Sequence, residues 1–292
     1  MTTSLLSKSQ ITGNEIRIIG SRKSGKTTYL ASLLRFPKEL KNKFPELEII
    51  PLTNHAEQLI EMAKNILEQG AIFAGTDIGD EPFYSFQIKI PASKKSPGIT
   101  LELSVKDYNG EAFEKAAQLH RLPEFQIYLD DWCTAPSWMI MLTDWEARND
   151  QRIYAPAIKK LLQEVSERAA IQPALNNLRV AVVMTKCERG ELWPCRFDPE
   201  EDLFKVRLQN TYRVLKENLP PSRLGFFACS AFGVLSDRPM DFDPRPNRYV
   251  PGDGSSAEFN TYLRDVSAWK PFGLISPLYW LSTGRLYHDE CL

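Results

Sequence analysis

The sequence predicts an α/β domain built around a mostly parallel β-sheet, and three observations support this. Apolar runs alternate with amphipathic helical segments along most of the chain. The runs at 15–19, 137–142 and 178–184 are apolar almost throughout, as expected for parallel strands covered on both faces. A glycine-containing loop joins the first of these runs to a helical segment. Strands and helices are therefore expected to alternate in space as they do in sequence.

The composition is that of a globular protein with its own core. The 292 residues carry 36 basic and 37 acidic side chains, and a net charge of −1 argues against binding nucleic acid through bulk charge. Five cysteines without C-x-x-C spacing and three distant histidines predict neither a disulfide framework nor a metal cluster. There is no signal-peptide-like start and no run of about 18 apolar residues, so we expect a cytoplasmic protein without a transmembrane segment.

The first half of the chain is predicted to contain two helices and a β-hairpin. Leucines at helical spacing predict a helix over 26–36, which the following proline is expected to stop. A second amphipathic helix is predicted over 55–69, with a glycine at its C-terminal end. Residues 83–90 and 99–106 alternate apolar and polar side chains around a turn rich in Pro, Lys and Gly, which predicts a hairpin.

The second half is predicted to continue the alternation and then to change character. Three helices and one further strand are expected near 111–121, 151–170, 200–218 and 224–229. Residues 232–262 are rich in Pro, Asp, Arg and Gly, so we expect a long loop. The apolar end, 269–286, is expected to pack back on the domain. Trp132, Trp138 and Trp145 are expected to pack in the core rather than to stack on a ligand.

The strongest motif is GSRKSGKT, which fits G-x-x-x-x-G-K-[ST] at every fixed position between a strand and a helix. Its glycines let backbone N–H groups surround a phosphate at a helix N-terminus; the alternative is a solvated basic turn. We expect Lys26, facing solvent, to reach the β- and γ-phosphates, and Thr27 to bind Mg²⁺. The predicted phosphate-binding residues are Gly20, Ser21, Arg22, Lys23, Ser24, Gly25, Lys26, Thr27 and Thr28.

A second motif, Asp107-Tyr108-Asn109-Gly110, directly follows the second strand of the predicted hairpin. A carboxylate there could hold Mg²⁺ through water, and the Gly110 N–H could bind a γ-phosphate. The alternative is an ordinary Asx turn. The next residue, Glu111, could accept a proton from an attacking water, or it is simply the acidic first-turn residue of the following helix.

Two further motifs, TKCE and CSAF, come at the ends of the last two predicted strands. Guanine presents N1–H and N2–H₂ on one edge, and the Glu188 carboxylate could accept both while the Lys186 stem covers the ring face. Alternatively, Glu188 is a solvated surface residue. The residues predicted to bind the base are Thr185, Lys186, Glu188, Ser230 and Ala231.

In this order GSRKSGKT, DYNG, TKCE and CSAF resemble the motifs of the P-loop GTPase superfamily, in its translation-factor-related class. The stretch before the hairpin is similar to bacterial double-GTPase or GTPase-associated-system proteins. The resemblance covers about 15–231 and implies a three-layer, Ras-like P-loop G domain. Its sheet would have six strands, mostly parallel, with one antiparallel edge strand from the hairpin. A single domain over 1–292 is implied, with an insertion at 37–80 and a C-terminal extension at 232–292.

The resemblance also implies GTP or GDP as the ligand, with Mg²⁺. It makes Thr76 the candidate for the switch threonine that completes a magnesium shell with Thr27 and Asp107; the alternative for Thr76 is an ordinary turn residue. The implied catalytic residues are Lys26, Thr76, Gly110 and Glu111. Two departures stand out: Glu188 replaces the family's Asp, and Glu111 replaces the Gln that orients water, which predicts slow hydrolysis.

Three functions remain open from the sequence. The first is a GTP-binding switch that hydrolyses GTP slowly with Mg²⁺ and has a protein effector or a second GTPase as partner. The second is a nucleotide-binding interaction module with little or no hydrolysis, which Glu111 supports. The third, a P-loop kinase or ATPase, fits the first motif but not TKCE and CSAF.

Overall fold

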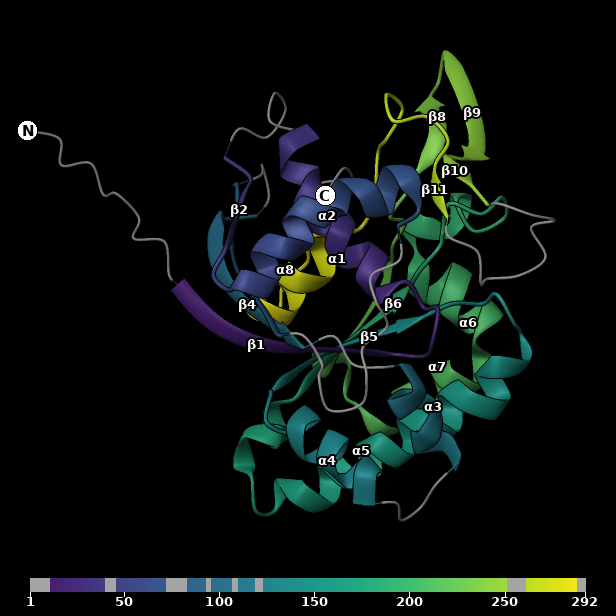
Figure 1. The fold of residues 1–292 in the computed structure, drawn as a ribbon. Helices are drawn as coiled ribbons and strands as arrows, with labels where there is room; N and C mark the ends of the chain where they lie inside the picture. The colour runs from purple at the N-terminus through teal and green to yellow at the C-terminus, as the bar shows by residue number, and fades with distance from the viewer. Residues whose placement is uncertain are drawn as a thin grey trace, which may run out of the picture.

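A β-sheet with seven strands in the described residues runs through the protein, with helices on both faces (Figure 1). This computed structural model describes residues 11–39, 46–71, 83–92, 96–106, 110–118, 123–250 and 261–287. The strands of the sheet are β1 (Ile11–Gly20), β2 (Glu48–Pro51), β3 (Phe83–Ile90), β4 (Ile99–Lys106), β5 (Ser137–Leu142), β6 (Arg179–Met184) and β7 (Leu224–Ala228). Their order is β2-β3-β4-β1-β5-β6-β7. All neighbouring pairs from β4 to β7 are parallel, which confirms the predicted α/β class.

The antiparallel edge has one strand more than predicted. The hairpin of β3 and β4 is confirmed, with Phe83 opposite Lys106. Beyond it, β2 pairs antiparallel with β3, placing Ile49 opposite Ile88, so the sheet has seven strands where six were predicted. The four residues of β2 are too few to show alternation, and they end in a proline, which an edge strand tolerates. The sequence therefore did not predict this strand, which lies inside the predicted insertion.

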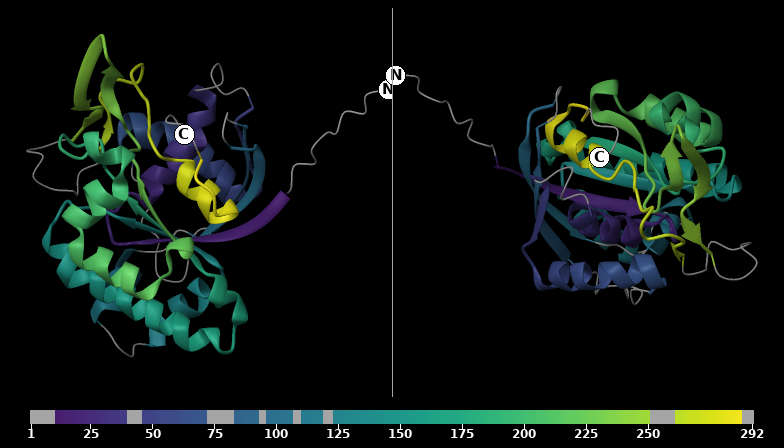
Figure 2. Two further views of the ribbon diagram at one scale, coloured as in Figure 1. Left: turned by 180° about the vertical axis from the view of Figure 1, so that it is seen from behind. Right: turned by 90° about the horizontal axis from the view of Figure 1, so that it is seen from above.

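Within the part of the chain that the structure describes, one face of the sheet is covered by α1 (Lys26–Glu39), α2 (Asn54–Gln69) and α8 (Ser276–Thr283) (Figures 1 and 2). The Thr53 hydroxyl accepts the Ala56 N–H at 3.3 Å at the start of α2, and Gly70, with φ 66°, ends the helix as predicted. Helix α1 extends past Pro37, where the sequence predicted its end. The buried residues of α8 confirm that the apolar C-terminal segment packs on the domain.

The opposite face is covered by α3 (Gly110–Gln118), α4 (Pro123–Trp132), α5 (Ala155–Ala169), α6 (Lys205–Arg207) and α7 (Gln209–Asn218). The segment predicted as one helix near 200–218 is instead a π-helical turn followed by α6 and α7. Trp132 and Trp138 are fully buried, and the Trp138 indole N–H donates to the Trp132 carbonyl at 2.9 Å. These two tryptophans are core residues, as predicted.

The segment predicted as a long loop contains paired strands. Strands β8 (Val234–Arg238) and β9 (Asp241–Pro246) form a projecting hairpin, visible in Figure 1, and β10 (Arg248–Tyr249) pairs with β11 (Tyr262–Leu263). The prediction of a loop over 232–262 is thus wrong for its described part. Val234 is the one buried residue of these two strands, so their sequence carries no buried apolar alternation to reveal them.

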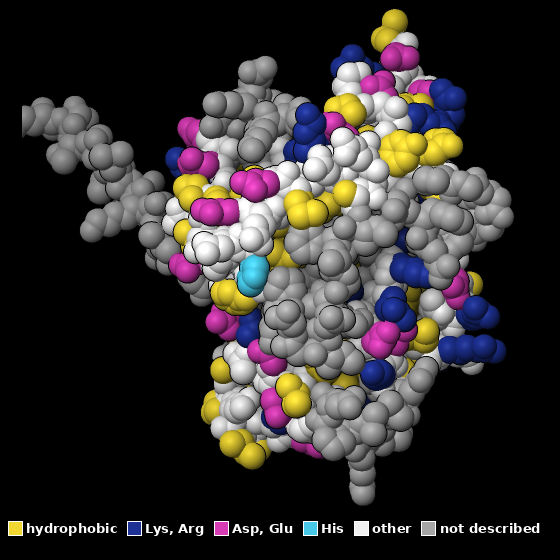
Figure 3. Space-filling view, in the orientation of Figure 1, with side chains coloured by type: hydrophobic (Ala, Val, Ile, Leu, Met, Phe, Trp, Pro, Cys, Tyr) yellow, Lys and Arg dark blue, Asp and Glu magenta, His cyan; other side chains and the backbone are white. Residues whose placement is uncertain are grey.

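The face in Figure 3 carries interspersed acidic and basic side chains, in keeping with the nearly balanced charge. No helix in the described part of the chain is both long enough and apolar enough to cross a bilayer.

A buried carboxylate, Asp150, holds the start of α7. Its Oδ1 accepts the Thr211 N–H at 2.9 Å, and its Oδ2 accepts both the backbone and the side-chain N–H of Asn210 at 2.9 Å. The N-cap position of α7, Leu208, has no capping side chain of its own. Asp150 therefore satisfies the N–H groups that a helix start leaves without partners.

Asp150→Ala is expected to lower the free energy of unfolding by about 2–4 kcal/mol, because buried backbone donors lose their acceptor. Urea unfolding monitored by circular dichroism measures this change. Glu217→Ala, at an exposed position of the same helix, serves as the control and should change stability by less than about 0.5 kcal/mol. Equal stability of the Asp150→Ala and control variants would contradict this role.

Candidate nucleotide-binding site

The loop between β1 and α1 has the backbone geometry that its glycines and its length require. Gly25 has φ 89° and Lys23 has φ 60°, both in the left-handed region. A Cβ at Gly20 would lie 2.3 Å from the Met141 carbonyl oxygen, so only glycine fits where the loop leaves β1. The chain thus forms a tight turn that ends at the N-terminus of α1, the arrangement that binds phosphate in many proteins.

Lys26 lies inside this loop rather than in solvent. Its side-chain ammonium donates to the Gly20 carbonyl at 3.1 Å and to the Ser21 carbonyl at 3.2 Å, and the residue is buried. The expectation that Lys26 faces solvent is therefore wrong, because a buried cation takes backbone carbonyls as acceptors. The same loop leaves Arg22 and Lys23 exposed.

The start of α3 packs directly on the loop. A Cβ at Gly110 would lie 2.3 Å from the Arg22 backbone nitrogen, and the Glu114 carboxylate accepts the Arg22 N–H at 2.8 Å. The Glu111 carboxylate lies 2.9 Å from the Arg22 guanidinium and 3.7 Å from the Lys115 ammonium. Gly110 and Glu111 therefore lie beside the phosphate loop. Glu111 is also a first-turn residue of α3.

Two predicted magnesium ligands, Thr76 and Asp107, lie outside the described residues, as do Tyr108 and Asn109. The third predicted ligand, Thr27, follows Lys26 at the start of α1 and lines a pocket next to the loop.

The TKCE segment is bound to the phosphate loop through its threonine. The Thr185 hydroxyl is 2.7 Å from the Ser24 carbonyl and 3.0 Å from the Leu142 carbonyl. The next residue, Lys186, has φ 61°, which turns the chain sharply after β6. These contacts bring the two loops to one end of the sheet, where the carboxyl ends of parallel strands form ligand sites.

Glu188 is a buried residue at the end of this turn, with 1% of its surface exposed. The Ser230 hydroxyl donates to its Oε2 at 2.8 Å, and the Gly233 N–H donates to the Ser230 hydroxyl at 2.8 Å. The alternative that Glu188 is a solvated surface residue is excluded. The hydrogen bond from Ser230 orients the carboxylate.

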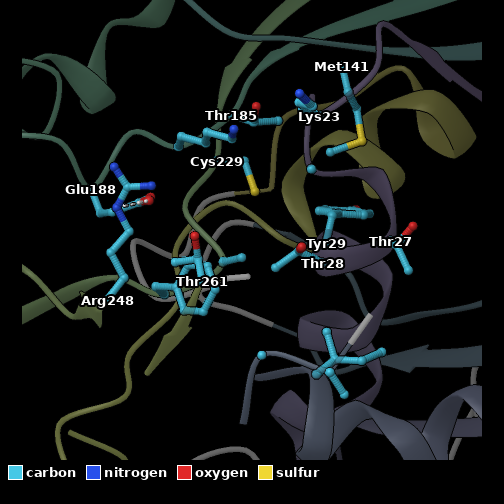
Figure 4. Close-up of a pocket in the computed structure, with 17 residues that line it drawn as sticks. Lys23, Thr27, Thr28, Tyr29, Met141, Thr185, Glu188, Cys229, Arg248 and Thr261 are labelled. Carbon is cyan, nitrogen blue, oxygen red and sulfur yellow. Dashed lines mark ion pairs between the residues drawn. The ribbon is translucent and has the colours of Figure 1, made fainter. Parts of the chain in front are cut away.

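One pocket combines the predicted phosphate-binding and base-binding residues. It is lined by Lys23, Gly25, Thr27, Thr28, Thr185, Lys186, Glu188 and Ala231, with side chains of α1, α2 and the C-terminal extension. Figure 4 shows Glu188 at one end of this pocket and Thr27 and Thr28 toward the other. The remaining predicted members, Gly20, Ser21, Arg22, Ser24, Lys26 and Ser230, belong to the same loops but do not line it. Residues of GSRKSGKT, TKCE and CSAF thus line one pocket, and Gly110, the described residue of DYNG, packs on the phosphate loop beside it.

Two residues around the TKCE loop were not predicted as site residues. Arg248, in β10, places its Nε 3.3 Å from the Glu188 Oε1 and lines the pocket. Trp145, predicted as a core residue, is half-buried, and its ring centroid lies 5.2 Å from Lys186, 5.1 Å from Arg189 and 5.2 Å from Arg248. For Trp145, its position just after a buried strand was a sequence signal for a site residue. No sequence signal pointed to Arg248.

Burial, reinforced by the nearby Arg248 charge, lowers the pKa of Lys186 from its ordinary 10.5 to about 8. The folded protein therefore loses this proton before the unfolded chain does, and stability linked to Lys186 rises with pH between about 8 and 10.5. We expect wild-type protein to gain more than about 1 kcal/mol of unfolding free energy relative to Lys186→Met across this window. Urea unfolding of both proteins at pH 7.5 and 10 measures the gain. A difference independent of pH would contradict the lowered pKa.

The fold and the site together define a nucleotide-binding P-loop domain. The family model described as Double-GTPase 1 matches residues 17–183, more than half of the chain. The chain therefore belongs to the Double-GTPase 1 family, as the resemblance in its motifs predicted. Membership in a GTPase family implies guanine-nucleotide binding. No curated protein matches the sequence.

Among solved structures, the GTPase-like domain of Ski7 from S. cerevisiae bound to GTP is 13% identical, with a TM-score of 0.37, covering 76% of this chain and 43% of that one. Sup35 complexed with GDP is 11% identical, with a TM-score of 0.35 and coverage of 79% and 40%. Aquifex aeolicus Era Y63A bound to GDP.AlF4- is 17% identical, with a TM-score of 0.33 and coverage of 76% and 52%. The chain thus spans about half or less of the length of each of these structures.

Proposed function

We propose that this protein binds GTP with Mg²⁺, hydrolyses it slowly and presents different surfaces in its triphosphate and diphosphate states. The observation that carries the proposal is the buried Glu188 carboxylate, which Ser230 orients in a pocket that begins at the phosphate loop. The N1–H and N2–H₂ groups of guanine suit such an acceptor, whereas adenine presents an acceptor at N1 and leaves the carboxylate without a donor. Guanine is therefore the expected base.

Lys26 and Thr27 are the residues proposed to meet the phosphates. The Lys26 ammonium would exchange its carbonyl partners for β- and γ-phosphate oxygens, and the Thr27 hydroxyl would bind Mg²⁺ together with Asp107 and Thr76. The residues present fit this group, since Thr27 lines the pocket and the positive-φ residues of the loop form a turn suited to an anion. When bound, Mg²⁺ would neutralise charge on the β- and γ-phosphate oxygens.

Gly110 is the proposed link between the γ-phosphate and a change of surface. Its close packing on the Arg22 backbone supports this, because a phosphate bound beside that backbone would alter how α3 rests on the loop. We expect residues 107–125 to differ between the two nucleotide states. Hydrogen exchange over this segment with GDP and with a non-hydrolysable GTP analogue tests the switch.

A second candidate function is a nucleotide-binding module with little hydrolysis. The ion pairs of Glu111 with Arg22 and Lys115 favour it, because they hold the carboxylate on cations of the protein. Single-turnover hydrolysis separates the candidates.

Glu111→Gln is expected to raise single-turnover GTP hydrolysis several-fold, because the amide removes a negative charge beside the γ-phosphate and can orient water. Glu114→Gln is the matched control, since it keeps an oxygen acceptor for the Arg22 N–H. A slower Glu111→Gln protein would instead make Glu111 the general base. No measurable hydrolysis by either wild type or Glu111→Gln would support the binding module.

We propose further that residues 1–292 form a single G domain, with 37–80 as an insertion and 232–292 as an extension, and that its partner is a protein effector or a second GTPase. The packing of α8 in the same hydrophobic cluster as α1, α2 and the sheet supports one cooperative unit. Two separate transitions in thermal unfolding would contradict a single domain.

A further inference from the structure

Glu188 has one buried oxygen that the described residues leave without a hydrogen bond. Oε2 accepts from the Ser230 hydroxyl at 2.8 Å, whereas Oε1 is buried and accepts no hydrogen bond within the described part of the chain. A buried carboxylate oxygen in this condition is costly unless a ligand supplies a donor. Its nearest cation is Arg248, 3.3 Å away.

Arg248 is held in place by its neighbours in the extension. Asn247, fully buried, donates its backbone N–H to the Gly233 carbonyl at 2.9 Å, and its side chain exchanges two hydrogen bonds of 2.8 Å with the backbone of Asp265. The Arg248 guanidinium lies over the Trp145 ring. Since Gly233 also donates to Ser230, the extension and the CSAF loop form one connected support around Glu188.

A carboxylate has about four acceptor positions. Ser230 uses one and the Arg248 charge faces a second, which leaves two for the two N–H groups on the guanine edge. Glutamate has one more rotatable bond than the aspartate usual in this family, so its carboxylate needs more support to keep both remaining positions aligned. Arg248 stands where it can supply that support.

We propose that Arg248 is a positioning residue for the base site: it holds the Glu188 carboxylate so that both N–H groups of guanine are accepted, and the C-terminal extension thereby sets base selectivity. This inference rests on the proposed guanine binding. The N2 amino group is the group whose recognition depends most on a second, well-aligned oxygen. Hypoxanthine lacks that amino group, so IDP reports on it directly.

The test is calorimetric titration of wild type, Arg248→Ala and Arg248→Lys with GDP, IDP and ADP. We expect Arg248→Ala to weaken GDP binding about 10-fold or more and IDP binding much less, so the preference for GDP over IDP falls toward one. Arg248→Lys keeps the charge and should retain part of the preference. Arg245→Ala is the control, since Arg245 pairs with Asp243 at an exposed position of the same extension.

The outcomes of this titration distinguish a failure of the proposed function from a failure of the role of Arg248. A wild type that does not prefer GDP to ADP overturns the proposed function itself. A wild type that prefers GDP, with the GDP-to-IDP ratio unchanged in Arg248→Ala, overturns only the role of Arg248. Tighter GDP binding by Arg248→Ala also overturns it, because the guanidinium would then be competing with the base for Glu188. If Arg248→Ala does not fold, Arg248→Lys and Arg248→Gln carry the same comparison.

Discussion

Replacing Lys26 with alanine is expected to reduce the affinity for a non-hydrolysable GTP analogue at least about 100-fold. The ammonium now donates to the Gly20 and Ser21 carbonyls and would donate to two phosphate oxygens when nucleotide is bound. Hydrogen bonds to charged groups contribute about 1.5–3 kcal/mol each, so losing two accounts for a change of this size. Isothermal titration with that analogue measures the affinity directly.

Lys23→Ala is the matched control for Lys26→Ala, because Lys23 lies in the same loop but is exposed. It should weaken binding by less than about 10-fold. Since Lys26 is buried, its removal leaves two carbonyls without their donor, and the fold of the variant needs its own check by circular dichroism. Lys26→Gln keeps a donor without the charge. Unchanged affinity for the GTP analogue in a folded Lys26 variant would refute the phosphate-loop assignment.

Glu188→Gln is expected to remove most of the preference for GDP over ADP. The amide keeps one acceptor and turns a donor toward the guanine edge, so one N–H of the base faces another N–H. A bidentate contact of this kind provides about 1–3 kcal/mol of discrimination or more, which predicts a loss of about 10- to 100-fold in the GDP-to-ADP affinity ratio. Competition titrations with both nucleotides measure the ratio.

The control for this substitution is Glu191→Gln, at an exposed position three residues further along the same loop. It should leave the ratio unchanged. A Glu188→Gln protein that still prefers GDP as strongly as wild type would show that the base is read by other groups.

The motif-bearing loops were predictable because each follows a strand that its apolar content identifies. Parallel strands place their carboxyl ends at one edge, so the predicted convergence of Lys26, Thr185 and Glu188 needed only the strand order. The hydrogen bond from Ser230 to Glu188 follows from the same geometry. For Glu188 the sequence left two alternatives open, a buried acceptor and a solvated surface residue. These alternatives differ only in whether the side chain is buried.

Other features depended on contacts that no local pattern encodes. Strand β2 is short and at an edge, where neither length nor alternation distinguishes it from a loop. Arg248 reaches Glu188 because Asn247 binds Gly233, a contact between distant parts of the chain. The buried position of Lys26 likewise depends on how the loop carbonyls close around it. Each of these features is determined by packing between parts of the chain that no local sequence pattern connects.

The measurement that tests the central claim most directly is a side-by-side calorimetric titration of the wild-type protein with GDP and with ADP in the presence of Mg²⁺. GDP is expected to bind at least about 100-fold more tightly than ADP, because the buried Glu188 carboxylate accepts from guanine and finds no donor on adenine. Equal affinity for the two nucleotides, or tighter binding of ADP, would contradict it.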